Sequence, residues 1–141
     1  MAGWGVQSML RTPALRRLAM KLIQVSARCF ACVNTRNLLC DANSGFLNAG
    51  EGLIVDTQSD RGHAEQMRGL FAAAAAEGLE LDADDGPREL ALPPRSDAWS
   101  PEIVVNTHED IDHVAGNMLF PEARIVAHRL TSDHMATTAD P

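Results

Sequence analysis

The stretch Asn106-Thr107-His108-Glu109-Asp110-Ile111-Asp112-His113 decides the fold, because it joins a strand pattern to a helix pattern through a cluster of ionisable side chains. Ile103-Val104-Val105, directly before it, is a short apolar and β-branched run, typical of a buried strand. Residues 114–120 continue with a short helical pattern, which Pro121 ends. We therefore expect the polar cluster on a loop at the carboxyl end of a strand, where open α/β sheets place their ligand sites.

Two imidazoles and two carboxylates lie in this loop at a spacing that no single helix face can bring together. They are His108, Asp110, Asp112 and His113, at positions i, i+2, i+4 and i+5. A turning loop can direct all four side chains at one centre, and neutral imidazole and ionised carboxylate are both good ligands for a divalent metal. The alternative is a solvated loop in which Asp110 or Asp112 caps the helix that follows.

The same stretch resembles the metal-binding loop of the metallo-β-lactamase superfamily, which has the pattern Thr-His-x-His-x-Asp-His after a strand, often followed by a Gly-Asn pair. The residues that match are Thr107, His108, Asp112, His113, Gly116 and Asn117. Asp110 departs from the pattern, because the second His of the family would stand there. Residues 120–121 and 125–128 continue in the family's manner, and residues 43–47 and 52–57 resemble the opening strands of its fold.

The resemblance implies an α/β fold, namely the first half of an αββα sandwich with one mixed β-sheet and helices on one face. It also implies a metal-dependent hydrolase, in which metal-bound hydroxide attacks an ester, amide or thioester carbonyl of a small-molecule substrate. By motif transfer, His108 and Asp110 would help to hold one metal, and Asp112 and His113 would hold a second. Asp112 would also act catalytically by orienting the nucleophile. Asp56 would support the loop from behind its ligands, although a turn or helix-entry role is the alternative.

Zinc is the cofactor that the resemblance favours, and the additional carboxylate of Asp110 leaves iron or manganese open. The family takes further ligands from a second half of its fold, and the chain ends at Pro141 before they could appear. We therefore expect a truncated hydrolase whose activity as this chain alone is doubtful. The alternatives are a non-catalytic metal-binding or interaction fragment, and an iron-dependent redox member of the same superfamily.

The composition is that of one ordinary domain. The chain has 141 residues, of which 45% are hydrophobic, and a net charge of -7. The negative charge argues against nucleic-acid binding, which requires a basic face. No run approaches the roughly 20 apolar residues of a membrane span, so we expect no membrane partner. A half-sandwich would leave one apolar sheet face uncovered, which favours a homo-oligomer formed through that face.

The N-terminal part of the chain differs from the rest in charge. Residues 1–40 contain six basic residues and no acidic one. We interpret residues 1–21 as a basic extension and residues 22–141 as the partial domain. The extension loosely resembles an organelle transit peptide, but a cytoplasmic protein is the preferred interpretation. Cys29, Cys32 and Cys40 have no second pair that would complete a zinc ribbon, so we expect reduced thiols and a reducing compartment.

Other segments give weaker predictions of local structure. Strand patterns cover residues 22–25, 29–33, 46–47, 53–55 and 124–128. A helix is expected from Asp60, which can cap its start, to Gly78, which can end it, and His63 is expected on the surface of its first turn.

The remaining segments are a loop and a last helix. Residues 79–101 are acidic and rich in proline and are expected to form an exposed loop, with Trp99 packing where the loop rejoins the sheet. Residues 131–133 predict the start of the last helix. His128 and His134 are expected to be surface or polar packing residues.

Overall fold

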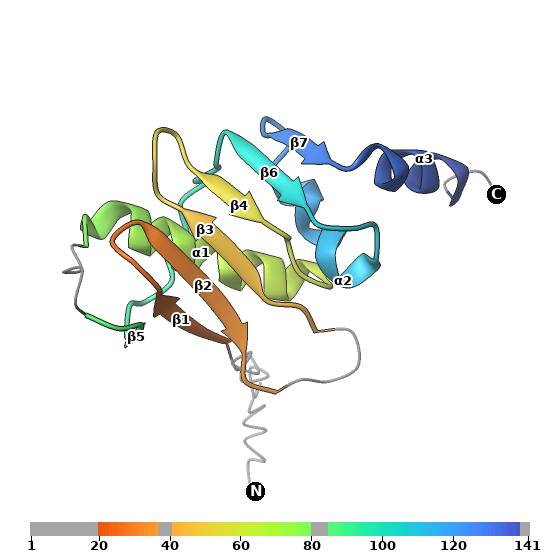
Figure 1. Ribbon diagram of the computed structural model, residues 1–141. Coiled ribbons are helices and arrows are strands. Elements are labelled where there is room, and N and C mark those ends of the chain that lie inside the picture. The colour runs from red at the N-terminus through yellow and green to blue at the C-terminus, as the bar shows by residue number, and fades with distance from the viewer. Residues whose placement is uncertain (1–19, 37–40, 80–84, 139–141) are drawn as a thin grey trace, which may run out of the picture.

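The computed structural model describes residues 20–36, 41–79 and 85–138, which form one mixed sheet with helices on one face (Figure 1). In these ranges seven strands lie in the order β5-β1-β2-β3-β4-β6-β7. The strands are β1 (Met20–Gln24), β2 (Cys29–Asn34), β3 (Ser44–Leu47), β4 (Leu53–Val55), β5 (Arg88–Leu90), β6 (Ile103–Asn106) and β7 (Arg124–Ala127). The helices are α1 (Arg61–Glu77), α2 (Ile111–Val114), the 3-10 helix η1 (Ala115–Leu119) and α3 (Arg129–Thr138). The predicted α/β architecture is confirmed.

The sheet has an antiparallel part and a parallel part. Strands β1 to β4 form a meander in which each strand pairs antiparallel with the next, and β5 pairs antiparallel with β1. After β4 the chain crosses over through α1, so that β6 pairs parallel with β4 and β7 pairs parallel with β6. The hairpin between β3 and β4 turns at Gly50 and Gly52, whose φ angles of 57° and 90° require glycine. As a result, the carboxyl ends of β4, β6 and β7 lie at one edge of the sheet.

Helix α1 has the capping residues that its sequence predicts. The side chain of Asp60 accepts a hydrogen bond from the backbone N–H of His63 at 2.9 Å, and Gly78 ends the helix in the left-handed conformation with φ 58°. The predicted apolar stripe faces the sheet and is buried; it consists of Met67, Leu70, Phe71 and Ala74.

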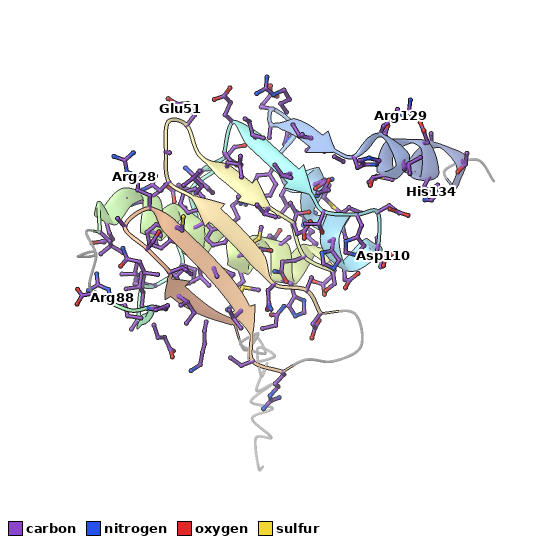
Figure 2. All side chains as sticks on the ribbon, viewed as in Figure 1. Arg28, Glu51, Arg88, Asp110, Arg129 and His134 are labelled. Atoms are coloured by element: carbon purple, nitrogen blue, oxygen red, sulfur yellow. The ribbon has the colours of Figure 1, made fainter. Side chains whose placement is uncertain are left out.

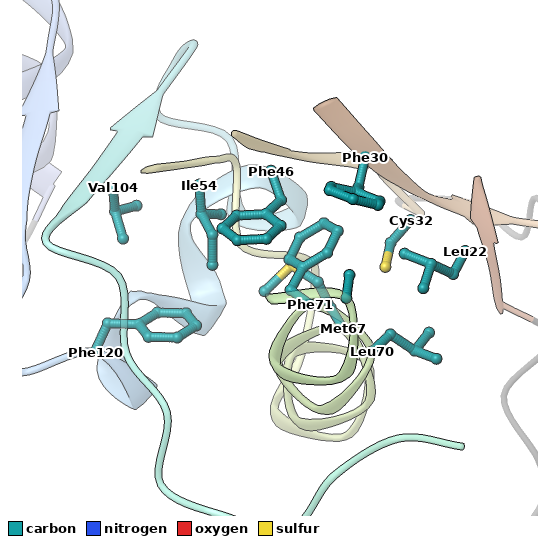
Figure 3. Packing of buried hydrophobic residues seen from close by; sticks show 11 residues of the cluster. Leu22, Phe30, Cys32, Phe46, Ile54, Met67, Leu70, Phe71, Val104 and Phe120 are labelled. Atoms are coloured by element: carbon teal, nitrogen blue, oxygen red, sulfur yellow. The ribbon is translucent and has the colours of Figure 1, made fainter. Parts of the chain in front are cut away.

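The core lies between α1 and the sheet (Figure 3). Phe46 is its centre, because its ring lies 5.8 Å from that of Phe30 and 5.2 Å from that of Phe71. The indole of Trp99 meets Phe46 edge-on at 5.1 Å, as expected for the end of the 79–101 segment. Cys32 is fully buried in the same core as a free thiol, and burial raises the pKa of that thiol, which makes it unreactive.

No described helix covers the opposite face of the sheet, which we call the open face (Figure 1). Strand pairing aligns one continuous row of small and apolar residues across it: Ile23, Ala31, Gly45, Val55, Val105 and Val126. Beside this row, Leu47 is 37% exposed. The central row of the open face is therefore apolar, as the sequence predicted for one half of a sandwich.

Three predictions of local structure are wrong. Residues 79–101 are not wholly a loop, since β5 forms there by pairing with β1, joined by an ion pair between Lys21 and Glu89 at 2.7 Å. The predicted helix over residues 114–120 begins earlier, as α2, and continues as the 3-10 helix η1. The last helix, α3, begins at Arg129, two residues before the predicted start. Among the described helices, none has the length and apolar character needed to cross a membrane.

Candidate metal centre

The candidate site is the loop between β6 and α2, at the carboxyl edge of the sheet. Asn106, the last residue of β6, is buried, and its side chain exchanges hydrogen bonds with the Asn117 amide of η1 at 2.8 and 3.3 Å. Both ends of the segment that contains the four candidate ligands are thereby joined. The loop is consequently closed on itself and cannot open without breaking a partly buried amide pair.

Asp56 holds this loop from the neighbouring strand. Its carboxylate is 5% exposed and accepts three hydrogen bonds, from the backbone N–H and the hydroxyl of Thr107 and from Nδ1 of His113, each at 2.8 Å. The backbone of Asp56 has a φ of 59°, a left-handed conformation that places the carboxylate under the loop. The structure therefore brings Asp56 to the position that the resemblance implied.

The hydrogen bonds fix the tautomers of both histidines. Thr107 has a single hydroxyl proton, which it donates to Asp56, so Nδ1 of His108, 2.9 Å away, must donate its own proton to Oγ1 of Thr107. Nδ1 of His113 faces a carboxylate and must also carry a proton. When each ring is neutral, its Nε2 atom is then an unprotonated lone-pair donor, which is the form in which histidine binds metals.

Each Nε2 atom lies beside its own carboxylate. The distance from Nε2 of His108 to Oδ2 of Asp110 is 3.4 Å, and the distance from Nε2 of His113 to Oδ2 of Asp112 is also 3.4 Å. Two ligands bound about 2.1 Å from a tetrahedral ion stand roughly 3.4 Å apart, so each pair fits two positions around one metal. We call these the first donor pair (His108 and Asp110) and the second donor pair (His113 and Asp112).

The four side chains form two separate pairs and do not surround one centre. In the described part of the chain, no three His, Cys, Asp or Glu residues gather closely enough to hold a metal ion. The two imidazole rings instead pack against each other, with centroids 3.9 Å apart and planes tilted by 48°. This packing turns each Nε2 toward a different carboxylate, so the loop supplies two incomplete ligand sets. The donors fit divalent metal in type, tautomer and spacing, but not in number.

A family model described as the metallo-beta-lactamase superfamily matches residues 38–140, which is most of the chain and includes the whole loop. The chain belongs to the metallo-β-lactamase superfamily. Its sheet with helices on one face is consistent with part of the metallo-β-lactamase fold. A search of curated proteins found no match to this chain.

Superfamily membership supports a metal-dependent hydrolase type of protein, since metallo-β-lactamase family members generally bind divalent metals. Within this metallo-β-lactamase loop, Asp110 is the departure from the family pattern. Its side chain is 72% exposed and projects from the tip of the loop (Figure 2). Asp110 occupies the N-cap position of α2 without making a side-chain cap hydrogen bond, so the capping alternative does not apply to it. Asp112 is more enclosed, at 22% exposed.

A contact that the sequence did not predict ties the last helix to this loop. Nδ1 of His134, on α3 (labelled in Figure 2), lies 2.7 Å from a carboxylate oxygen of Glu109, which stands in sequence between the two members of the first donor pair. The hydrogen bond from His134 lowers the pKa of the Glu109 carboxyl, and the same bond raises the pKa of His134. No sequence pattern could have found this pair, because 25 residues separate its members.

His63, predicted on the surface, is mostly enclosed. Its side chain is 17% exposed, with Nδ1 2.6 Å from Oδ2 of Asp60 and Nε2 3.9 Å from Oδ1 of Asp41. The prediction was wrong because it considered α1 alone, whereas residues before β3 return to cover the first turn of the helix. Asp41 and Asp60 are not candidate ligands, so these contacts do not make His63 part of the candidate metal centre.

Proposed function

We propose that this chain carries the metal-binding loop of a metal-dependent hydrolase that cleaves an ester, amide or thioester bond in a small-molecule substrate. The observation that supports the proposal best is the tautomer of the two histidines. Both Nδ1 atoms are occupied by protein acceptors, so both Nε2 lone pairs are free and each faces a carboxylate. A solvated loop without a ligand does not require both histidines to be held in the tautomer that leaves Nε2 unprotonated.

Each residue has a distinct role in the proposal. His113 and Asp112 would hold one ion, and His108 and Asp110 would contribute to a second position. Asp56 keeps the proton on Nδ1 of His113 and so keeps Nε2 available. Asp112 also orients the attacking water by accepting its proton in a hydrogen bond. A divalent ion bound here supplies a Lewis acid and lowers the pKa of a coordinated water.

The metal that we propose is zinc, because imidazole nitrogen supplies one donor of each pair. The exposed carboxylate of Asp110 makes iron or manganese the alternative, since hard oxygen ligands suit those ions. Water molecules and further protein ligands would fill the positions that the two donor pairs leave open.

A cavity beside the loop could receive the substrate. It has a volume of about 600 Å³ and lies between β6, β7 and α3, lined by Asn106, residues 124–127, Ser132 and Met135. Small-molecule sites commonly have volumes of about 300–1,000 Å³, with apolar walls and few polar groups. Ile125 and Met135 supply apolar wall, and Asn106 adjoins the metal loop.

The second candidate function is a metal-binding module without catalysis. It is favoured by the absence of any convergent set of three ligands among the described residues, because an ion held by two protein donors cannot orient a substrate well. The two candidates differ in turnover but share the metal.

The test measures zinc binding by calorimetry and hydrolysis of generic esters and thioesters with and without a chelator. His108→Ala and His113→Ala are expected to weaken zinc binding about 10-fold or more. The matched control is His128→Ala, which removes an exposed histidine outside the loop. Equal zinc binding in all four proteins would refute both candidates. Chelator-sensitive turnover supports the hydrolase, and zinc binding without turnover by this chain supports the non-catalytic module.

A further inference from the structure

The connection from β4 to α1 contains two left-handed residues that are not glycine. Asp56 has a φ of 59°, and Gln58 has a φ of 79°. Aspartate adopts this region more readily than most residues, but glutamine has no such tendency, so its backbone conformation must be imposed by its surroundings. Gln58 is therefore the residue of this connection whose conformation needs an explanation.

The side chain of Gln58 is fully buried and fully paired. Its Nε2 donates to the hydroxyl of Ser44 at 2.6 Å, and its Oε1 accepts from Nδ2 of Asn34 at 2.9 Å. Ser44 begins β3, and Asn34 ends β2. The amide thus bridges the ends of two strands, and releasing it would leave buried polar groups unpaired, which is strongly unfavourable.

Gln58 is connected to the candidate metal centre through Thr57. The backbone N–H of Thr57 donates to the carbonyl of His113 at 2.7 Å. The carbonyl of Thr57 is packed so closely against η1 that a Cβ added at Gly116 would lie 2.0 Å from it. The connection is therefore held at one end by the Gln58 amide and at the other by the loop, and Asp56 lies between them. A shift at Gln58 must displace the Asp56 carboxylate or break the contacts of Thr57.

We propose that Gln58 is a positioning residue of the candidate metal centre: its buried amide anchors the left-handed turn that presents the Asp56 carboxylate to His113 and Thr107. The inference rests on the proposed function only in taking His113 as a metal ligand. In the metal-free protein, its consequence is that Gln58 determines which nitrogen of the His113 ring carries the proton. The simpler alternative is that Gln58 only fills buried volume and satisfies hydrogen bonds.

The experiment compares Gln58→Met and Gln58→Gly with the unmodified protein. Methionine keeps the length and approximate volume of the side chain but removes both amide hydrogen bonds. Glycine also removes them, yet it accepts a φ of 79° without strain. The matched control is Gln24→Met, because Gln24 is the other fully buried glutamine among the described residues and lies at the opposite edge of the sheet, bonded to the carbonyl of Leu79 and to Arg88.

The primary readout is the long-range nitrogen–proton NMR spectrum of the His113 ring in the metal-free protein, at a pH where the ring is neutral. The unmodified protein and Gln24→Met should show the proton on Nδ1. Gln58→Met and Gln58→Gly should show a mixture of tautomers, and their zinc affinity should fall about 10-fold. If Gln58→Met does not fold, the His113 tautomer in Gln58→Gly tests the inference.

An unchanged His113 tautomer in the folded Gln58 variants would overturn the inference. A tautomer change in Gln24→Met as large as in the Gln58 variants would also overturn it, because any loss of a buried amide would then suffice. The result is separable from the proposed function. If the unmodified protein binds no zinc, the proposed function fails while the tautomer comparison still decides the role of Gln58.

Discussion

A single hydroxyl proton organises the candidate metal centre at the scale of the residue. Thr107 donates that proton to Asp56, and it can accept from His108 only because the proton is already directed elsewhere. One threonine therefore links the buried carboxylate to the more exposed of the two histidines. Its backbone N–H adds a second bond to the same carboxylate.

Thr107→Val tests this link, since valine has nearly the same shape but no hydroxyl. We expect zinc binding to weaken about 10-fold, because His108 loses the acceptor that holds its tautomer. Competition against a chromogenic chelator measures the affinity. Thr137→Val is the control, because it removes a hydroxyl that donates to the carbonyl of His134 within α3. Equal affinity in the unmodified protein and Thr107→Val would show that the hydroxyl does not order His108.

Asp110 gives a second prediction at this scale, about metal preference. A carboxylate in place of imidazole favours oxygen-seeking ions, so Asp110→His should shift selectivity from manganese toward zinc by about 10-fold. Competition titration of zinc against manganese on both proteins measures the ratio. An unchanged ratio would mean that Asp110, already 72% exposed, does not touch the metal.

At the scale of the element, the start of α1 combines a helix cap with a mostly enclosed histidine. Partial burial raises the pKa of Asp60, whereas hydrogen bonds from the backbone and ring of His63 lower it. The hydrogen bonds together have the larger effect, so the net pKa of Asp60 is below the ordinary value. The ionised carboxylate therefore stabilises the folded state. That stabilisation is fully present above the unfolded pKa of about 3.9 and is lost as the pH falls through the lower folded pKa.

Asp60→Ala should lower the free energy of unfolding by about 1 kcal/mol at pH 7, because α1 loses its cap. The difference from the unmodified protein should shrink as the pH falls below about 4, since the carboxylate that the variant lacks is then protonated in both states. Urea denaturation across this pH range measures the effect. A difference that stays constant from neutral to acid pH would contradict the role of the ionised form.

The elements that the sequence predicted well are those whose signals are local. Helix α1, with its stripe and two caps, and the β3–β4 hairpin, with Gly50 and Gly52, follow from spacing and backbone conformation alone. Strand β5 could not be predicted, because Arg88-Glu89-Leu90 has no strand pattern and forms a strand only by pairing with β1. The resemblance already grouped the four candidate ligands as His108 with Asp110 and Asp112 with His113, but the packing of the two imidazole rings against each other depends on the tertiary structure, which spacing does not determine.

At the scale of the whole molecule, the open face dominates the behaviour of the chain. The apolar row crosses six strands spaced about 4.8 Å apart, so it is roughly 24 Å wide. An apolar surface that no described element covers favours association between copies. We propose that the chain self-associates through the open face.

Leu47→Lys should shift the protein toward monomer by at least 10-fold in dissociation constant, because it places a charge beside the central row of the open face. Sedimentation velocity over a concentration series measures the shift. Met118→Lys is the control: Met118 is 63% exposed and belongs to η1, on the helical side of the sheet. A monomeric unmodified protein would contradict the proposed self-association. Equal dissociation constants for the two variants would mean that the protein associates through a surface other than the open face.

The split of the sheet into a meander and a crossover has a consequence for the order of events during synthesis. Strands β1 to β4 pair with neighbours in sequence and can assemble as soon as β4 leaves the ribosome, whereas β6 joins β4 only after α1 has formed the crossover. Asp56 is in place early, but Thr107 and His113 reach it late. The metal therefore cannot nucleate the meander. We expect zinc to slow unfolding of the finished protein while leaving the early refolding rate unchanged.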